Sequence, residues 1–303
     1  MSPKHLISII GPTAVGKTSL AIAISRHFKA PILSADSRQF YKEMTIGTAV
    51  PTPAELATAP HHFIQHKSIH ESYNVGDFEK EAISFLTDHF QKHDIAILVG
   101  GSGLYTDAVC HGLDHFPNVK SEIRNQLNEQ YQSLGLKSLQ EELAQVDPHS
   151  LKTLDLNNPV RVIRALEVYK ASGKPFSSFQ NRSRPSRPFK VHTIGIEAER
   201  DVLYERINKR VDLMVEMGLE EEALSLLPFK NLNALNTVGY KELFSFFEGQ
   251  ISLAEAIEDI KKNSRRFAKR QGTWNRKKSD VIWVPYTEAK EKSLHYLEAS
   301  LPW

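Results

Sequence analysis

The stretch GPTAVGKT, residues 11–18, decides which fold we expect for this chain. It matches the phosphate-loop pattern G-x-x-x-x-G-K-[ST] at every fixed position. Residues 5–10, HLISII, are apolar and rich in isoleucine, which predicts a buried strand, and residues 19–28, SLAIAISRHF, predict a helix. A strand, a glycine loop and a helix in this order form a phosphate-binding unit. An ordinary glycine turn would leave the Gly16-Lys17-Thr18 run unexplained.

The chemistry of such a loop is that of anion binding. Glycines let the backbone curl until several N–H groups point at a phosphate, and the helix N-terminus adds its dipole. Lys17 supplies a point charge, and the Thr18 hydroxyl is a candidate ligand for Mg²⁺. The loop alone leaves open whether a phosphoryl group is transferred or a diphosphate leaves.

Composition narrows the class of protein. A length of 303 residues suggests about two domains, or one large domain with an insertion. The net charge of +2 is too small to indicate nucleic-acid binding by itself. The single cysteine, Cys110, excludes an intramolecular disulfide framework and a cysteine-based zinc site, and is consistent with a reducing cytoplasm. No apolar run reaches the roughly 18 residues of a membrane span, so we expect no membrane partner. The first strand follows the N-terminus directly, so we expect no signal peptide. We expect a cytoplasmic monomer.

The order of elements predicts an α/β fold: a P-loop NTPase-like parallel sheet core flanked by helices, with an all-helical inserted domain. After the first strand, further strands are expected in residues 30–36, 61–69, 95–101 and 190–198. A Pro-rich loop is expected at 51–60, and a helix after the cap candidate Asn74. Between the expected strands at 95–101 and 190–198, the sequence favours helices at residues 121–135, 138–147 and 158–173. It favours a surface linker at 177–189. The expected boundaries are 1–113 and 189–303 for the core and 114–188 for the insertion.

The C-terminal quarter carries one strong charge feature. Residues 261–278 contain nine Lys and Arg residues and no acid. On a helix Lys262, Arg266 and Arg270 share a face, and Trp274 lies within the run. Basic side chains with an aromatic ring are typical of binding to single-stranded or looped RNA. A solvated helix face is the alternative interpretation.

Polar residues follow two other expected strands. Asp36 ends one of them and precedes Ser37, Arg38 and Gln39, and the Gly100–Gly103 loop with Ser102 ends another. Open α/β sheets bind ligands at this edge, where Asp36 could accept a proton. A helix cap and a plain glycine turn are the alternatives.

Two residue pairs complete the list of candidates. The neighbouring His61 and His62 point apart on a strand and have no acid at ligand spacing, which argues against a metal site. Arg161 and Arg164 share one helix face and could hold an RNA backbone or make surface ion pairs.

Eight motifs together resemble a known family, the tRNA dimethylallyltransferases, also called tRNA isopentenyltransferases. In chain order they are GPTAVGKTSLA, ADSRQFYKEMTIGTAVPT, PHHFI, YNVGDF, GGSGLY, RVIRALEVY, VGYKEL and AKRQGTWNRK. They extend over about residues 5 to 280. The resemblance implies transfer of a dimethylallyl group from dimethylallyl diphosphate to the N6 amine of the adenosine just 3′ of the anticodon, with release of diphosphate and help from Mg²⁺.

The resemblance also implies roles for residues. Asp36 matches the family's proton acceptor and Thr13 a residue near the leaving oxygen. The implied diphosphate site is Gly11, Pro12, Thr13, Ala14, Val15, Gly16, Lys17, Thr18 and Arg210, with Thr18 on the metal. The implied tRNA contacts are Asp36, Ser37, Arg38, Gln39, Ser102, Arg124, Val160, Arg161, Val162, Ile163, Arg164, Arg266, Arg270 and Trp274. The helical insertion corresponds to the family's domain for the anticodon stem-loop.

The chain departs from the family pattern at a few positions. Val160 stands where the family usually has Gln, which removes a side-chain hydrogen bond. GGSGLY replaces the usual GGTGLY and keeps a hydroxyl at Ser102, and Phe40 replaces a valine, which we interpret as a packing change. The C-terminal zinc finger of eukaryotic members is absent, so the chain resembles the bacterial type.

Other functions fit part of the sequence. A P-loop small-molecule kinase would need an acidic metal-binding strand end, but the strand at 95–99 ends in Gly100. A non-catalytic RNA-binding protein would explain residues 261–278 but not Lys17 or Asp36. An adenylate isopentenyltransferase, acting on free nucleotides, would not need the basic run with Trp274.

Overall fold

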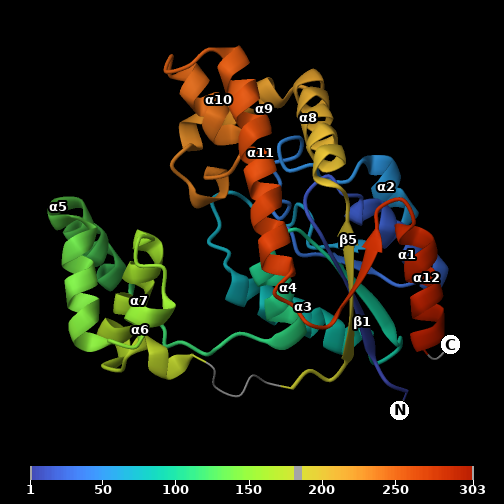
Figure 1. Ribbon diagram of the computed structural model, residues 1–303, viewed down its shortest axis with the longest axis horizontal. Coiled ribbons are helices and arrows are strands. Elements are labelled where there is room, and N and C mark those ends of the chain that lie inside the picture. Colours follow the sequence, from blue (N-terminus) through green and yellow to red (C-terminus); the bar gives the residue numbers. More distant parts are fainter. Residues whose placement is uncertain (1, 181–185, 302–303) are drawn as a thin grey trace. The chain divides into compact units, whose positions relative to one another are not determined.

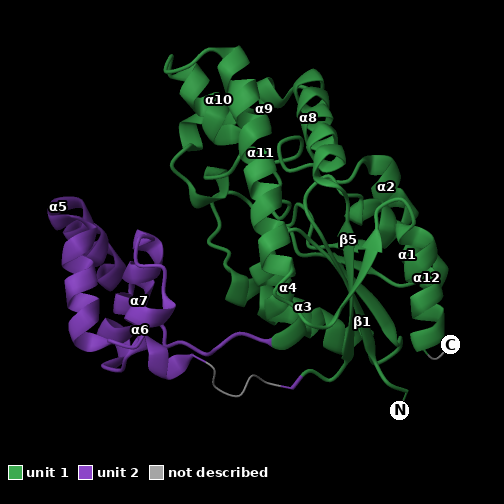
Figure 2. Cartoon of the chain, viewed as in Figure 1, with its two compact units in different colours: residues 1–111, 187–303 green, residues 112–186 purple. Residues whose placement is uncertain are grey.

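The structure is a computed structural model that describes residues 2–180 and 186–301. The chain forms two compact units, coloured separately in Figure 2. Unit 1 comprises Met1–His111 and Arg187–Trp303, and unit 2 comprises Gly112–Ser186. Unit 2 is thus an insertion in the sequence of unit 1.

The centre of unit 1 is a parallel six-stranded sheet in the order β3-β2-β4-β1-β5-β6. Strands β1 and β5 are labelled in Figure 1. The strands are β1 His5–Ile10, β2 Ile32–Ser34, β3 His61–His62, β4 Ile95–Val99, β5 Lys190–Glu197 and β6 Val281–Pro285. Every residue of β1 is buried, and β1 pairs with β4 on one side and β5 on the other. The predicted α/β parallel-sheet class is confirmed.

Helices cover both faces of this sheet. They are α1 Lys17–Phe28, α2 Pro53–Thr58, α3 Val75–His89, α4 Gly103–His111, α8 Arg200–Glu216, α9 Leu219–Leu226, α10 Tyr240–Phe247, α11 Leu253–Asn275 and α12 Ala289–Ser300, with short 3₁₀ turns at Leu227–Phe229 and Asn233–Leu235. Successive strand residues alternate between the two hydrophobic cores. Leu6 and Leu98 belong to the core cluster that contains residues of α3, α4, α10 and α11, whereas Ile7 and Ile97 belong to the cluster that contains residues of α1, α8 and α12.

Two local predictions for unit 1 need correction. The Pro-rich loop at 51–60 contains the helix α2, because the Thr52 side chain and Glu55 form a capping box at its start. The expected strand at 61–69 is only the two-residue β3. The cap candidate Asn74 does cap α3, through its side-chain oxygen and the N–H groups of Gly76 and Asp77.

The regular elements in the described part of unit 2 are all helical, and they follow an irregular segment at 112–120. Its elements are α5 Ser121–Val146, α6 Ser150–Thr153, α7 Pro159–Ser172 and the 3₁₀ turn η1 Phe176–Phe179. Gly135 interrupts α5 with φ 75° and ψ 177°, so α5 is two helices, as the sequence predicted. The core includes Leu127, Leu143, Val162 and Leu166.

A buried carboxylate joins two elements of unit 2. Asp147 accepts hydrogen bonds from the backbone N–H and hydroxyl of both Ser150 and Ser177, at 2.6–3.2 Å. The linker expected at 177–189 therefore begins later than predicted, because η1 packs into the core through Phe176 and Phe179. Residues 181–185 of that linker lie outside the described residues. In the parts of both units that the structure describes, no helix is long and apolar enough to cross a membrane.

Candidate functional site

The phosphate loop follows β1 and curls through a left-handed backbone. Gly11, Ala14 and Gly16 have φ of 151°, 63° and 109°. A Cβ on Gly11 would lie 2.8 Å from the Ile196 carbonyl oxygen of β5, so only glycine fits this close approach. Helix α1 then begins at Lys17 with no acidic residue in its first turn. The N–H groups of that turn and the positive end of the helix dipole therefore remain available to an anion.

Three cationic side chains surround the loop. Lys17 Nζ donates to the Pro12 carbonyl at 2.8 Å. Burial lowers the pKa of Lys17 to about 8, with the Asp36 charge acting in the opposite direction. From α8, Arg210 Nη1 lies 3.4 Å from the Thr13 hydroxyl, and Arg206 Nε donates to the Ala14 carbonyl at 2.8 Å. The loop thus holds positive charge on both sides, as a polyphosphate requires.

A cavity of about 1120 Å³ opens over this loop, and its lining comes from unit 1. It includes the phosphate loop, the Asp36 segment, residues 99–105, and parts of α8 and α11. The Asp36 and Gly100–Gly103 segments meet there because β2 and β4 are neighbours whose carboxyl ends share one edge. Ser37 N donates to Ser102 Oγ at 3.1 Å, which joins the two segments. The sequence-predicted polar residues of unit 1 therefore share one cavity, except Arg266, which does not line it.

Asp36 is held by its own turn. Its Oδ1 accepts from the Arg38 backbone N–H at 3.1 Å. Its Oδ2 lies 3.6 Å from the position that a Cβ on Gly101 would take, so this oxygen faces the glycine loop. Such a carboxylate can accept a proton from a group bound in the cavity.

The side chains of Arg38 and Gln39 bind the protein backbone. Arg38 donates to the carbonyls of Asn233, Ala234 and Asn236. Gln39 donates to the carbonyls of Thr48 and Ala49 and accepts from Ser34 Oγ. These donors fix the cavity wall in this conformation, while the hydroxyls of Ser37 and Ser102, 3.1 Å apart, border the cavity itself.

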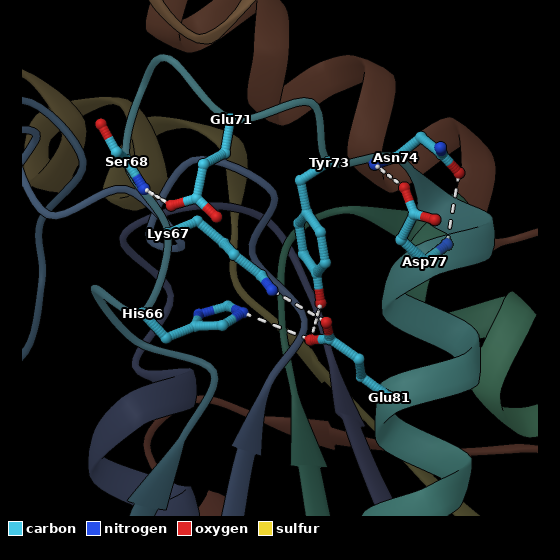
Figure 3. A network of polar contacts seen from close by, with 8 residues as sticks. All are labelled: His66, Lys67, Ser68, Glu71, Tyr73, Asn74, Asp77 and Glu81. Atoms are coloured by element: carbon cyan, nitrogen blue, oxygen red, sulfur yellow. Dashed lines mark hydrogen bonds and ion pairs between the residues drawn. The ribbon is translucent and has the colours of Figure 1, made fainter.

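A polar network supports the Asp36 segment from the side of α3. The backbone of residues 39–42 pairs with that of 65–67, through bonds such as Lys67 N to Phe40 O at 2.9 Å. Figure 3 shows Lys67, His66 and Tyr73 pointing toward Glu81 of α3, with Lys67 Nζ at 2.8 Å and the Tyr73 hydroxyl at 2.8 Å. Phe40 is buried beside them and stacks on Phe78. The network ties the paired segments 39–42 and 65–67 to α3.

On α11 the basic residues divide into two groups. Lys261, Lys262 and Lys278 form ion pairs with acidic side chains. Arg266 and Arg270 are exposed and lie near the neutral Asn263 and Phe267. Trp274 is 41% exposed, and its indole Nε1 donates to Asp107 Oδ2 at 2.9 Å. The Trp274 ring is therefore held in place by the hydrogen bond at its Nε1 atom, and part of the ring remains exposed to solvent.

In unit 2 the predicted contact residues have different surroundings. Val160 and Arg161 are exposed at the start of α7. Arg124 and Arg164 both pair with Glu167, at 3.2 and 3.3 Å. Val162 and Ile163 face the helical core, with 0% and 5% of their surfaces exposed. They fall on the inner face because a run of consecutive helix residues cannot all face one side.

The sequence of this chain matches a known protein family over most of its length. A family model described as IPP transferase matches residues 39–278. The chain belongs to the IPP transferase family.

Relatives of this IPP transferase extend over nearly its whole length. Proteins named tRNA dimethylallyltransferase are 57% identical in Christiangramia forsetii and 50% identical in Flavobacterium johnsoniae, each match covering 98% of both chains. A solved tRNA isopentenylpyrophosphate transferase from Bacillus halodurans is 37% identical with a TM-score of 0.73, covering 98% of this chain and 96% of its own. A eukaryotic dimethylallyltransferase solved while acting on tRNA has a TM-score of 0.82 at 24% identity, over 99% of this chain and 80% of its own, and shows the same fold.

Sequence reasoning missed three residues that shape the site of this IPP transferase. Gln271 joins the phosphate loop to Gly101, Arg206 holds the Ala14 carbonyl, and Glu222 binds three backbone N–H groups of residues 45–47. Gln271 lies within the quoted motif AKRQGTWNRK, which was the available signal for it. Nothing in the local sequence pointed to the other two.

Proposed function

We propose that this protein transfers a dimethylallyl group from dimethylallyl diphosphate to the N6 amine of the adenosine just 3′ of the anticodon in tRNA. One observation carries the proposal: in a member of the IPP transferase family, the phosphate loop and Asp36 line the same cavity. The cavity of about 1120 Å³ is large enough for both a prenyl diphosphate and an extruded base.

In the proposed reaction the N6 amine attacks C1 of the dimethylallyl group, and the bond from C1 to the diphosphate oxygen breaks. Diphosphate leaves with the electron pair. Lys17, Arg210 and the loop N–H groups stabilise the negative charge that grows on it. Asp36 takes the proton that N6 loses. Thr13, beside Arg210, lies near the leaving oxygen. The rest of the proposed diphosphate site is the backbone of Gly11 to Thr18.

Mg²⁺ is the proposed metal. Among residues 2–180 and 186–301, no three His, Cys, Asp or Glu side chains gather as a metal site. The donor set fits an ion held mainly by diphosphate oxygens and water, with the Thr18 hydroxyl as the protein ligand, since Mg²⁺ commonly keeps several waters beside phosphates. The bound ion would offset the negative charge of the diphosphate.

The proposed tRNA surface has parts in both units. In unit 1 it consists of Ser37, Ser102, Arg266, Arg270 and Trp274, with Arg38 and Gln39 fixing the cavity wall. In unit 2 it consists of Arg124, Val160, Arg161 and Arg164. Glu167 supports that role, because one buried carboxylate holds the exposed Arg124 and the half-exposed Arg164 in fixed positions for phosphate groups. Since tRNA is the acceptor, we place the reaction in the cytoplasm.

The test incubates purified protein with labelled dimethylallyl diphosphate, Mg²⁺ and either unmodified tRNA or AMP. We expect label on the tRNA adenosine beside the anticodon and none on AMP. Label on AMP alone would indicate an adenylate isopentenyltransferase. Brisk ATP hydrolysis without prenyl transfer would indicate a kinase-like P-loop enzyme. Either result would refute the proposal.

A further inference from the structure

Gln271 is a buried amide on the basic helix α11, with 6% of its surface exposed. Its Oε1 accepts from the Thr13 backbone N–H at 2.8 Å, and its Nε2 donates to the Gly101 carbonyl at 2.9 Å. One side chain therefore connects the phosphate loop, the glycine loop and the helix that bears Arg266 and Arg270. Only an amide of this length supplies the acceptor and the donor together.

The connection lies at the proposed reaction centre. A Cβ on Gly101 would fall 2.4 Å from Gln271 Nε2 and 3.6 Å from Asp36 Oδ2. The Gln271 amide and the Asp36 carboxylate thus border the same small space, and glycine at 101 leaves room for both. The amide is neutral, so it can lie there without adding to the negative charge of Asp36.

Thr13 is bonded through both its backbone and its side chain. The Thr13 N–H donates to Gln271 Oε1, and the Thr13 hydroxyl accepts from Arg210 Nη1 at 3.4 Å. The next residue, Ala14, has φ 63°, a conformation that is unfavourable for a residue with a Cβ. A loop with such a residue needs contacts from outside to keep its shape.

Helix α11 is also fixed near its C-terminal end. Trp274 on the helix and Lys278 just beyond its end both bind the Asp107 carboxylate of α4. A Cβ on Gly103 would lie 2.4 Å from the Trp274 ring, so the ring packs closely on the glycine loop. Helix α11 therefore contacts the glycine loop through Gln271 and Trp274, and Gln271 extends the contact to the phosphate loop.

We infer that Gln271 is a positioning residue that acts through Thr13: it fixes the phosphate loop so that the Thr13 hydroxyl and Arg210 flank the oxygen at which the donor's C–O bond breaks. This inference rests on the proposed function. It assigns to the RNA-binding helix a direct part in shaping the leaving-group site.

The test is a double-mutant cycle on the single-turnover rate at saturating tRNA and donor. Gln271→Met removes both bonds at similar volume, and Thr13→Val removes the hydroxyl but keeps the backbone N–H. We expect Gln271→Met to lower the rate at least 30-fold in the wild-type background and less than threefold in the Thr13→Val background, because residues that act together are non-additive. The tRNA affinity should stay within twofold. The matched control is Thr273→Val, an exposed position on the same helix.

Additive rate losses, or a loss explained by weaker tRNA binding, would overturn the inference. Gln271→Asn keeps a neutral amide that is one methylene too short to bridge both loops. It serves as the second variant if Gln271→Met does not fold, and the same non-additivity is expected of it.

A second measurement separates this inference from the proposed function. Inorganic pyrophosphate with Mg²⁺ is titrated, without tRNA, into three proteins: the wild type, Gln271→Met and Thr273→Val. We expect Gln271→Met to weaken pyrophosphate binding about tenfold and Thr273→Val to leave it unchanged, and equal affinities in the three proteins would refute the positioning role. If the wild type bound pyrophosphate but transferred no prenyl group to tRNA, the proposed function would fail, while this titration would still decide whether Gln271 shapes the loop.

Discussion

Glu222 of α9 binds the backbone of a segment that lines the cavity, and its substitution tests whether these hydrogen bonds keep the segment closed. Its carboxylate accepts from the backbone N–H groups of Thr45, Ile46 and Gly47 at 2.8–2.9 Å and from the Tyr240 hydroxyl at 2.7 Å. Residues 45–50 line the cavity. We predict that Glu222→Ala releases this segment locally, because three N–H groups lose their acceptor at once.

The size of the effect follows from these contacts. A hydrogen bond to a charged group contributes about 1.5–3 kcal/mol, and less where water can replace the acceptor, as at the exposed Thr45 bond. With about 1.5 kcal/mol for each of the part-buried Ile46 and Gly47 bonds and none for the exposed Thr45 bond, the carboxylate stabilises the closed segment by about 3 kcal/mol. Since about 1.4 kcal/mol corresponds to a factor of ten, the segment should open roughly 100-fold more often.

Hydrogen–deuterium exchange, followed by mass spectrometry of a peptide that covers residues 44–49, measures this opening directly. Glu222→Ala should exchange roughly 100-fold faster than the wild type, and Tyr240→Phe, which loses one of the four bonds, less than tenfold faster. Glu221→Ala, an exposed neighbour on the same helix, is the control. Unchanged exchange in Glu222→Ala, or equal acceleration in Glu221→Ala, would refute the reasoning.

Four further predictions concern catalysis, RNA binding and stability. Asp36→Ala should lower the single-turnover rate at least about 100-fold with little change in tRNA affinity, because a general base contributes about 10²–10⁴; an unchanged rate would contradict the assignment. Arg266→Ala should weaken tRNA binding and reduce the slope of log affinity against log salt by about 0.7–0.9; a slope equal to that of the wild type would exclude a phosphate contact. Burial and the neighbouring His5 lower the pKa of His192 to about 4 in the folded protein. As the pH falls from about 6.5 toward 4, the His192 imidazole is therefore protonated in the unfolded chain but not in the folded protein, which favours unfolding. Urea midpoints followed by tryptophan fluorescence should then show a loss of about 2 kcal/mol from pH 7 to pH 5, and His192→Gln should flatten that dependence; an equally steep dependence in the variant would assign the loss to other groups. Asp147→Asn should speed hydrogen exchange in residues 150–179 and leave peptides of unit 1 unchanged, since Asn cannot accept all four serine bonds; equal protection of residues 150–179 in variant and wild type would contradict this.

Much of the site could be predicted because its pattern is local. The phosphate loop has a fixed spacing between Gly11 and Thr18, and Asp36 and Gly100 each end an apolar strand. The carboxyl ends of neighbouring parallel strands meet at one sheet edge, so the meeting of these segments follows from fold class alone. No knowledge of side-chain packing was needed.

The supporting residues could not be predicted in this way, because their contacts are distant in sequence. Thr13 and Gln271 are 258 positions apart, and Glu222 binds N–H groups 175–177 positions before it. A short motif carries no information about which distant backbone groups a glutamate will meet. Val162 and Ile163 show a second limit: a sequence match to a contacting stretch does not say which face of the helix each residue occupies.

The placement of unit 2 in the chain has a consequence for synthesis. Strand β1 pairs with both β4 and β5, but β5 begins only at Lys190, after the whole insertion. At about 5–20 residues per second, the ribosome needs roughly 4–17 s to extend the chain from the end of α4 to the end of β5. During that time one edge of β1, which is fully buried in the folded protein, has no partner, and such an edge can pair with another chain. The insertion thus delays completion of the sheet, and the nascent protein passes through a stage at which it is most exposed to aggregation.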